Sequence, residues 1–312
     1  ANIAKRFMIK ALQDTANFDI VGIASRSPKK ADEFAKIFDS TAFYSYDELI
    51  NGKNVDAIYM PLPTGLHYDW IKKCLNAGKH VLCEKSLVST IDEAMEVIDI
   101  AKDKKLVLME NFMFRLHSQH KLIKQIIDSG EIGELRSVRS SFGFPPFPDE
   151  NNIRYQKSLG GGALLDAGGY TVQASQMFLQ SDLEVIASTL SVDTNKDVDI
   201  YGSAYLRDSN GLSSHINFGF DNFYQCNYEL WGSKGKLTSH RAFTAGPGLE
   251  PMITIEKQGF SEQKKLESDN HFINICNLFY SRILDNTDFS FLDDLRKQAW
   301  LISEIKSKAK IY

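Results

Sequence analysis

Hydrophobic and polar positions in the first 115 residues follow two alternating patterns. Short apolar runs at 18–25, 55–63, 80–85 and 106–112 are typical of buried strands. Between them, segments with helical spacing predict helices at 2–14, 27–38, 46–51, 65–78 and 89–105. Strands that alternate with helices of this length indicate βαβ units, so we predict a doubly wound parallel sheet of the dinucleotide-binding type.

From residue 116 onward the pattern changes to consecutive strands on short turns. Strands are expected at 135–144, 183–192, 199–208, 212–220, 224–232, 236–240 and 252–257. Helices are expected at 117–135, 163–179, 269–285 and 292–309. We therefore predict two domains, 1–115 and 116–312, the second an α+β domain with a large antiparallel sheet that is covered on one face. By analogy, its exposed face is expected to join copies into a homodimer or homotetramer.

Composition narrows the class of protein. The chain has 312 residues and a net charge of −4, so its composition indicates neither a nucleic-acid-binding nor a membrane-binding surface. Its four cysteines lack CxxC spacing, which favours reduced thiols and a cytoplasmic location. His117 and His120 are three residues apart with no matching acidic partner, so we expect no metal site and predict substrate contact or surface exposure for both.

Candidate cofactor residues lie where the predicted parallel strands end, because ligands of such sheets bind beyond the carboxyl ends of the strands. These residues are Ser25, Arg26, Ser27, Pro61, Leu62, Thr64, Glu84 and Lys85. An acid that would hold the ribose 2′-hydroxyl of NAD is missing after the strand at 18–25, and Arg26 stands there instead. Because arginine suits a 2′-phosphate, NADP(H) is favoured over NAD(H). His67 is expected either to face the nicotinamide or to cap its own helix.

The dinucleotide fingerprint GxGxxG is absent from the sequence. Ala1, Asn2 and Ile3 are expected to be its tail, leading into a helix whose N-terminus would hold the pyrophosphate. The chain begins with a helical pattern and without methionine, so we expect a first strand and a glycine turn to precede it.

A glycine-rich segment at 159–170 has five glycines in twelve residues and carries Asp166 and Tyr170. At positions i and i+4 of a helix these two side chains share one face. Gly168 and Gly169 inside a helix each cost about 1 kcal/mol relative to alanine, so a neighbouring group is expected to need the room. Arg154, after a proline-rich loop, is expected either to bind a diphosphate or to form a salt bridge between loop and helix.

Four stretches together resemble the glucose-fructose oxidoreductase / inositol dehydrogenase / MocA-like (GFO/IDH/MocA) family: residues 1–4 with their helix, 56–67, 81–85 and 160–170. The resemblance implies an NAD(P)-binding Rossmann domain, an open-faced sheet domain and a substrate cleft. The segments 110–120, 152–155 and 241–244 look most like the family's nucleotide-sugar ketoreductases. That likeness adds Asn111 as a cofactor contact and Phe112 and Tyr155 as substrate contacts. The family's Glu-Lys pair is usually followed by proline, often with a cis peptide, so Ser86 here predicts a different local backbone.

Enzymes of the family that the chain resembles oxidise or reduce sugars. Three residues of this chain suit that reaction. Reducing a ketone by hydride transfer places negative charge on its oxygen, which an acid or a cation must meet. We expect Tyr170 to protonate that oxygen, Lys85 to supply positive charge, and Asp166 to orient Lys85 or bind a sugar hydroxyl. The expected function is NADP(H)-dependent reduction of a keto sugar linked to a nucleotide. The alternatives are an NADP-dependent dehydrogenase of free sugars or trans-dihydrodiols, and a non-catalytic regulator that senses the cofactor.

Overall fold

The computed structural model describes residues 2–179, 182–285 and 287–312. The chain forms two compact units. Unit 1 comprises Ala1–Val88, Asp92–Asn111 and Phe272–Arg296, and unit 2 comprises Ser89–Ile91, Phe112–His271 and Lys297–Tyr312. The units therefore do not follow a single boundary at 115/116, because a C-terminal segment returns to the first unit.

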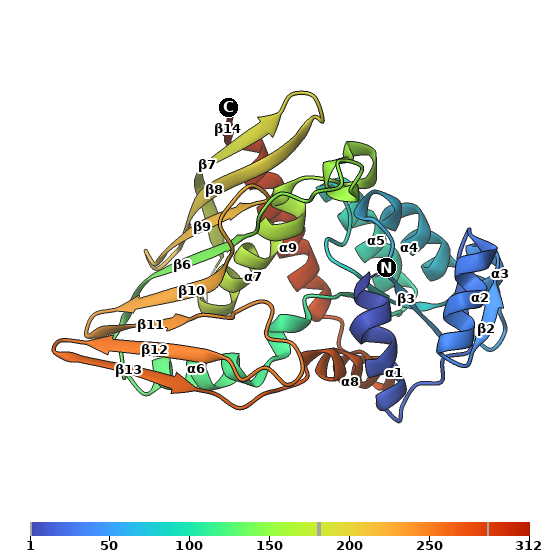
Figure 1. Ribbon diagram of the computed structural model, residues 1–312, viewed down its shortest axis with the longest axis horizontal. Helices are drawn as coiled ribbons and strands as arrows, with labels where there is room; N and C mark the ends of the chain where they lie inside the picture. Colours follow the sequence, from blue (N-terminus) through green and yellow to red (C-terminus); the bar gives the residue numbers. More distant parts are fainter. Residues whose placement is uncertain (1, 180–181, 286) are drawn as a thin grey trace. The chain divides into compact units, whose positions relative to one another are not determined.

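Unit 1 contains parallel strands and the helices that connect them (Figure 1). Its strands are β1 (Gly22–Ala24), β2 (Thr41–Phe43), β3 (Ala57–Met60), β4 (His80–Cys83) and β5 (Leu108–Glu110). Its helices are the π-helical turn η1 (Ala4–Met8), α1 (Ile9–Asp14), α2 (Pro28–Ile37), α3 (Tyr46–Ile50), the 3₁₀ turn η2 (Thr64–Leu66), α4 (His67–Asn76), α5 (Ile91–Asp103) and α8 (His271–Leu284). The parallel pairing that the alternating pattern predicts is confirmed, but in two sheets, β1–β2 and β3–β4–β5.

Local sequence explains how several of these elements end. Gly78 follows α4 with φ of 76°, the left-handed conformation that glycine adopts readily, so the chain can turn directly into β4. Ser27 lies at the N-cap of α2, but its side chain makes no capping hydrogen bond. Instead the backbone N–H of Ser27 donates to the Ser25 hydroxyl at 3.2 Å. The short strand β2 was not predicted.

Helix α8 packs in unit 1 although it follows the whole of the large sheet in sequence. The ring of Phe272 stacks on Phe7 with centroids 4.7 Å apart, and Phe279 stacks on Phe18 at 6.3 Å. Stacked aromatic pairs of this kind bury large apolar area, which explains why α8 joins the N-terminal helix rather than the preceding sheet.

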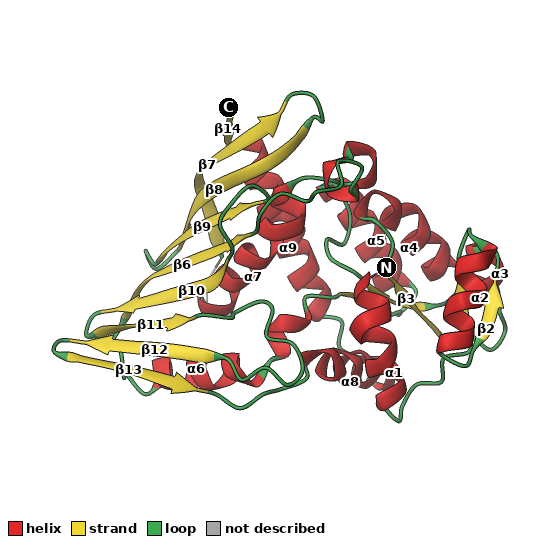
Figure 2. Cartoon of the chain, viewed as in Figure 1, coloured by secondary structure: helices red, strands yellow, loops and turns green. Residues whose placement is uncertain are grey.

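Unit 2 is built on a nine-stranded sheet with the order β13-β12-β11-β10-β6-β9-β8-β7-β14. Its strands are β6 (Leu135–Gly143), β7 (Leu183–Asp193), β8 (Val198–Asp208), β9 (Ser213–Gly219), β10 (Gln225–Gly232), β11 (Gly235–Ser239), β12 (Met252–Lys257), β13 (Phe260–Lys265) and β14 (Ala309–Ile311). Its helices are the 3₁₀ turns η3 (Met113–Leu116), η4 (Ile153–Tyr155) and η5 (Lys157–Leu159), then α6 (Ser118–Asp128), the π-helical turn η6 (Leu164–Gly168), α7 (Gly169–Phe178) and part of α9 (Phe291–Ser307). Figure 2 shows α6 and α7 beside this sheet, and residues of α6, α7 and α9 share its hydrophobic core.

The expected antiparallel sheet is in fact mixed. Strands β6 and β9 pair in parallel, as do β14 and β7. The first exception arises because the chain leaves β6 through α7 and then runs a three-strand meander, so β9 returns beside β6 in the same direction. The predicted hairpin turn at 208–211 is confirmed, with Asp208 Oδ1 accepting the N–H of Asn210 at 2.9 Å.

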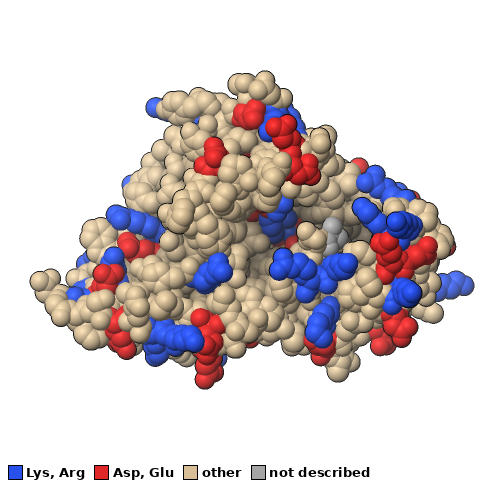
Figure 3. All heavy atoms as spheres, in the orientation of Figure 1, with Lys and Arg blue, Asp and Glu red and all other residues tan. Residues whose placement is uncertain are grey.

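Charged side chains of both signs are interspersed over the face in view in Figure 3, consistent with the small net charge. Among the helices that the structure describes, none combines the length and the apolar character needed to cross a membrane.

Candidate active site

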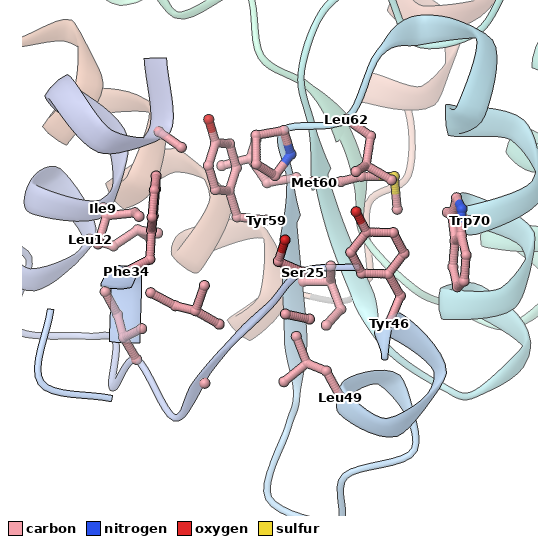
Figure 4. A pocket seen from close by; sticks show the side chains of 18 of the residues that line it. Ile9, Leu12, Ser25, Phe34, Tyr46, Leu49, Tyr59, Met60, Leu62 and Trp70 are labelled. Carbon is pink, nitrogen blue, oxygen red and sulfur yellow. The ribbon is translucent and has the colours of Figure 1, made fainter. Parts of the chain in front are cut away.

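A groove of about 730 Å³ lies in unit 1, lined by residues of β1 and β3 and by side chains of α1, α2 and α3 (Figure 4). In Figure 4 the labelled side chains of Ile9, Leu12 and Phe34 gather on one side of it, and Tyr46 and Trp70 lie on the other. Six of the residues predicted to bind a cofactor line this groove: Asn2, Ser25, Arg26, Ser27, Pro61 and Leu62. Five of them follow the ends of β1 and β3, and Asn2 lies at the start of the N-terminal helical segment.

Basic side chains other than the predicted Arg26 also line the groove. Arg26 is exposed, and no carboxylate in the described ranges is within salt-bridge distance of it. Lys5 and Lys30 also line the groove, together with the acids Asp19 and Glu33. Sequence reasoning missed both lysines, although Lys30 lies in the first turn of α2 only four residues after Arg26. The N–H groups of Arg26, Lys5 and Lys30 can bind a phosphate group at the end of the groove that carries Arg26.

Two other predicted residues, Ile3 and Thr64, do not line this groove in the described structure. Ile3 precedes η1 in helical conformation, and Thr64 begins η2 at the end of the β3 loop. Ala1 lies outside the described residues.

Glu84 and Asn111 form a buried polar pair at the ends of β4 and β5. Glu84 Oε1 accepts the Tyr59 hydroxyl at 2.7 Å and Asn111 Nδ2 at 2.7 Å. Burial, the largest effect, raises the pKa of Glu84, and these hydrogen bonds oppose the rise. Glu84 was predicted to contact the cofactor, but its described contacts lie within the fold, where it holds Asn111. Asn111 Oδ1 is buried and has no hydrogen-bond partner among the described residues, so it is an acceptor suited to an amide N–H of a ligand.

The loop that carries Lys85 is fastened on both sides. Leu87 donates its N–H to Glu110 Oε1 at 2.7 Å. His67 Nδ1 lies 2.8 Å from the Ser86 carbonyl oxygen, and His67 Nε2 lies 2.8 Å from the Leu62 carbonyl oxygen. Lys85 itself is half-buried.

Two expectations about this loop are corrected. His67 was expected to face the nicotinamide or cap its helix, but its side chain is fully buried and both ring nitrogens face backbone carbonyls of neighbouring loops. Desolvation lowers its pKa. His67 therefore links the ends of β3 and β4. The altered backbone expected at Ser86 is also not found, since the Lys85–Ser86 peptide is cis.

In unit 2 the glycine-rich segment lies directly against the sheet. A Cβ at Gly168 would lie 3.2 Å from the ring of Phe218, and one at Gly169 would lie 3.0 Å from the ring of Phe112. The room left by the two glycines is therefore used for close packing of the helix. The turn that carries Asp166 is π-helical, wider than the α-helical turn expected there.

Tyr170 is half-buried in a cluster of phenylalanine rings. Phe142 and Phe112 meet its ring edge-on with centroids 5.0 and 5.2 Å away, and Phe114 and Phe243 lie at 5.5 and 5.8 Å. Rings on several sides restrict the rotamer of Tyr170 and so the direction of its hydroxyl. Phe112, predicted to touch substrate, is buried, so its observed role is to pack against Tyr170.

Arg154 and Asp166 form an ion pair, with Nε 2.5 Å from Oδ2. The loop-to-helix salt bridge expected for Arg154 is therefore formed, and it gives Asp166 a partner that sequence reasoning did not consider. The guanidinium also lies over the ring of Phe147, 4.6 Å from its centroid. Tyr155, predicted to bind substrate, is buried, and its hydroxyl accepts the N–H of Phe147 at 3.0 Å.

The two histidines expected to touch substrate or lie at the surface are both buried. His117 caps α6, its Nδ1 accepting the N–H of Gln119 at 3.1 Å. His120 lies 2.8 Å from the Tyr228 hydroxyl and 3.1 Å from the Ala242 carbonyl oxygen. Burial, assisted by the nearby His117, lowers the pKa of His120 to about 3, so the ring is neutral at neutral pH.

Comparison with known proteins gives matches along most of the chain. The model of the oxidoreductase family with an NAD-binding Rossmann fold (GFO/IDH/MocA) matches residues 1–112, and that of the GFO/IDH/MocA C-terminal domain matches residues 120–238. A dTDP-3,4-didehydro-2,6-dideoxy-α-D-glucose 3-reductase from Actinomadura kijaniata is 37% identical over 311 residues, covering 99% of this chain and 93% of the relative. An enzyme with the same name from Saccharopolyspora spinosa is 40% identical over 270 residues, covering 86% and 81%.

Solved structures include KijD10, a 3-ketoreductase from Actinomadura kijaniata in complex with NADP and TDP-benzene. It superposes with a TM-score of 0.96 at 37% sequence identity, covering 100% of this chain and 96% of that one. With both family models matched in order and relatives of this identity over nearly its full length, the chain belongs to the GFO/IDH/MocA family of oxidoreductases.

Proposed function

We propose that this protein reduces the keto group of a nucleotide-linked sugar with NADPH as the reductant. The observation that carries the proposal is the 37% identity, over 99% of the chain, to a dTDP-linked sugar 3-reductase. The NADP and TDP-benzene bound by KijD10, which shares the fold over the whole chain, support the same cofactor and a nucleotide-linked substrate.

The residues of the groove fit NADP. Arg26 binds the 2′-phosphate, with Lys30 also lining the groove, since neither an acid at this position nor a paired carboxylate competes for the guanidinium. The carbonyl oxygen of Asn111 accepts a hydrogen bond from an amide such as that of nicotinamide. When bound, NADPH supplies the hydride.

The proton and the charge come from the chain itself. Tyr170 donates its hydroxyl proton to the keto oxygen, and Lys85 stabilises the negative charge that develops there. The phenylalanine cluster around Tyr170 orients that hydroxyl. Asp166 holds Arg154 through Nε, which leaves the terminal N–H groups of the guanidinium to bind the diphosphate of the substrate.

The test is an NADPH-oxidation assay with a dTDP-linked 3-keto sugar, with D-xylose and NADP⁺ as the free-sugar comparison. Turnover of the nucleotide-linked substrate, at a kcat/KM well above that for the free sugar, is expected. Tight NADPH binding without turnover of any keto sugar would favour the cofactor-sensing regulator, and preference for the free sugar would favour the dehydrogenase.

We also propose that copies of the chain associate through the exposed face of the nine-stranded sheet. Trp231 and Tyr201 on that face are 52% and 49% exposed, and Arg139 lies over the Trp231 ring at 5.5 Å. Exposed aromatic and arginine side chains of this kind are enriched in interfaces. Light scattering should show that Trp231→Glu dissociates the oligomer, whereas Phe223→Glu, in the turn after β9, leaves it intact. A monomeric wild-type protein would contradict this proposal.

A further inference from the structure

The side chain of Asp199, on strand β8, contacts the start of η6. The turn η6 carries Asp166 and continues into α7, which carries Tyr170. Asp199 Oδ2 accepts the backbone N–H of Leu164 at 2.6 Å. Burial raises the pKa of this carboxyl, while the N–H groups of Leu164 and Ala163 and the charge of Lys306 oppose the rise. A half-buried acid is therefore directed at backbone groups at the start of η6.

These N–H groups need a partner from outside the helix. The first N–H groups of a helix have no acceptor within it, and a nearby side-chain oxygen usually caps them. Ala163, the residue at the N-cap of η6, has no side chain that can do so, and no side-chain cap is formed there. Asp199 supplies the cap from a strand 35 residues further along the chain.

Gly162 shows how tightly this contact is built. Its φ of 118° lies in the region that favours glycine, and a Cβ there would collide with Oδ1 of Asp199. The Gly162 N–H donates to the Arg154 carbonyl oxygen at 2.9 Å, and its own carbonyl accepts the N–H of Asp166 at 3.2 Å. Asp199 thus packs against the residue that joins the Arg154 loop to the Asp166 turn.

Resting on the proposed reductase function, we infer that Asp199 is a positioning residue for Tyr170 and for the Arg154–Asp166 pair. It fixes the start of the helix to β8, and Tyr170 follows Leu164 by less than two helical turns. A small rotation of that first turn would move the Tyr170 hydroxyl away from the keto oxygen, and misplacement by about 1 Å can lower a rate by roughly 100-fold.

The decisive experiment is a double-mutant cycle between Asp199→Asn and Tyr170→Phe, read as kcat with the dTDP-linked 3-keto sugar. Asparagine keeps one acceptor oxygen but directs an N–H₂ at backbone donors. We expect Asp199→Asn alone to lower kcat about 10- to 100-fold, and by less than about 3-fold in the Tyr170→Phe background, since coupled residues are not additive. The Kd of NADPH should stay unchanged. An equal loss of kcat in both backgrounds would overturn the inference.

Asp208 offers a matched control on the same strand. It is buried and also accepts backbone N–H groups, those of Asn210 and Leu212 at 2.9 Å each, but it serves the β8–β9 turn. Asp208→Asn should leave kcat unchanged.

Hydrogen exchange separates this inference from the function on which it rests. Asp199→Asn should lower amide protection within residues 163–170, and Asp208→Asn should lower it only near 208–212. This readout needs no turnover, so a protein without reductase activity would still test the capping role. Unchanged protection at 163–170 would overturn the inference. Asp199→Ser, which retains a smaller acceptor, serves if the asparagine variant does not fold.

Discussion

The groove of unit 1 and the helix of unit 2 provide candidate chemistry in two different ways. In the groove, Ser25, Arg26 and Ser27 are consecutive residues at the end of one strand, and Arg26 is exposed with no described carboxylate beside it. In unit 2 the polar groups are already engaged with one another: Asp166 with Arg154, and Asp199 with Leu164. The groove therefore has donors available to a ligand, whereas the helix is organised to hold one hydroxyl in place.

The largest expected effect is the loss of kcat when Tyr170, on the helix of unit 2, is replaced. Tyr170→Phe should lower kcat by roughly 10²–10⁴-fold, the usual worth of general acid catalysis, while KM and the Kd of NADPH change little. The phenylalanine ring retains the packing against Phe112 and Phe142, so the variant should fold normally. Lys85→Ala should be at least as damaging to kcat. Full activity in Tyr170→Phe would show that the tyrosine serves packing alone.

A smaller effect is expected for the groove, because a single exposed contact is lost there. Arg26→Ala should weaken NADPH binding by about 1.5–3 kcal/mol, roughly 10- to 150-fold, and leave NADH binding nearly unchanged. Lys29→Ala is the matched control, since Lys29 is exposed on the same helix start but is not among the residues that line the groove. Calorimetric titration with both cofactors measures the difference, and an equal loss for NADH would refute the 2′-phosphate assignment.

The smallest effect concerns the stability of unit 2 in acid. His120 has a folded pKa of about 3 and an unfolded pKa of about 6.5, so the unfolded chain takes up a proton first as the pH falls. Its stabilisation is complete above pH 6.5 and is lost progressively down to about pH 3. At pH 5.5 the loss is about 1.4 kcal/mol for this one group.

Urea unfolding at pH 7.5 and 5.5 measures this loss. The difference in unfolding free energy between the two pH values should shrink by about that amount in His120→Gln. It should shrink by less in His215→Gln, because His215 is exposed on the sheet, although desolvation lowers its pKa in the same direction. An undiminished pH dependence in His120→Gln would show that other groups carry it.

Periodicity in the sequence determined most elements and placed several predicted cofactor residues at the ends of strands. Helix and strand patterns are local, and parallel strands that end at one edge bring their following residues together without any detail of packing. This is why Arg26 and Pro61 could be placed at strand ends that line the groove, whereas Glu84, also at a strand end, contacts Tyr59 and Asn111 instead. Strand β13, by contrast, is exposed at every residue and has no alternation, and β14 has three residues, so neither left a recognisable pattern.

Only the tertiary structure decided which partners the side chains take. Phe112 and Tyr155, predicted to contact substrate, are buried and support the fold. His67, expected either to face the nicotinamide or to cap its helix, is buried between backbone carbonyls of two loops. Arg154 and Asp166 are in contact although they are twelve residues apart in the sequence, and Asp199 accepts the N–H of Leu164 from thirty-five residues away. The reason is that a buried polar group must find a partner, and the fold, not the neighbouring sequence, determines which group is within reach.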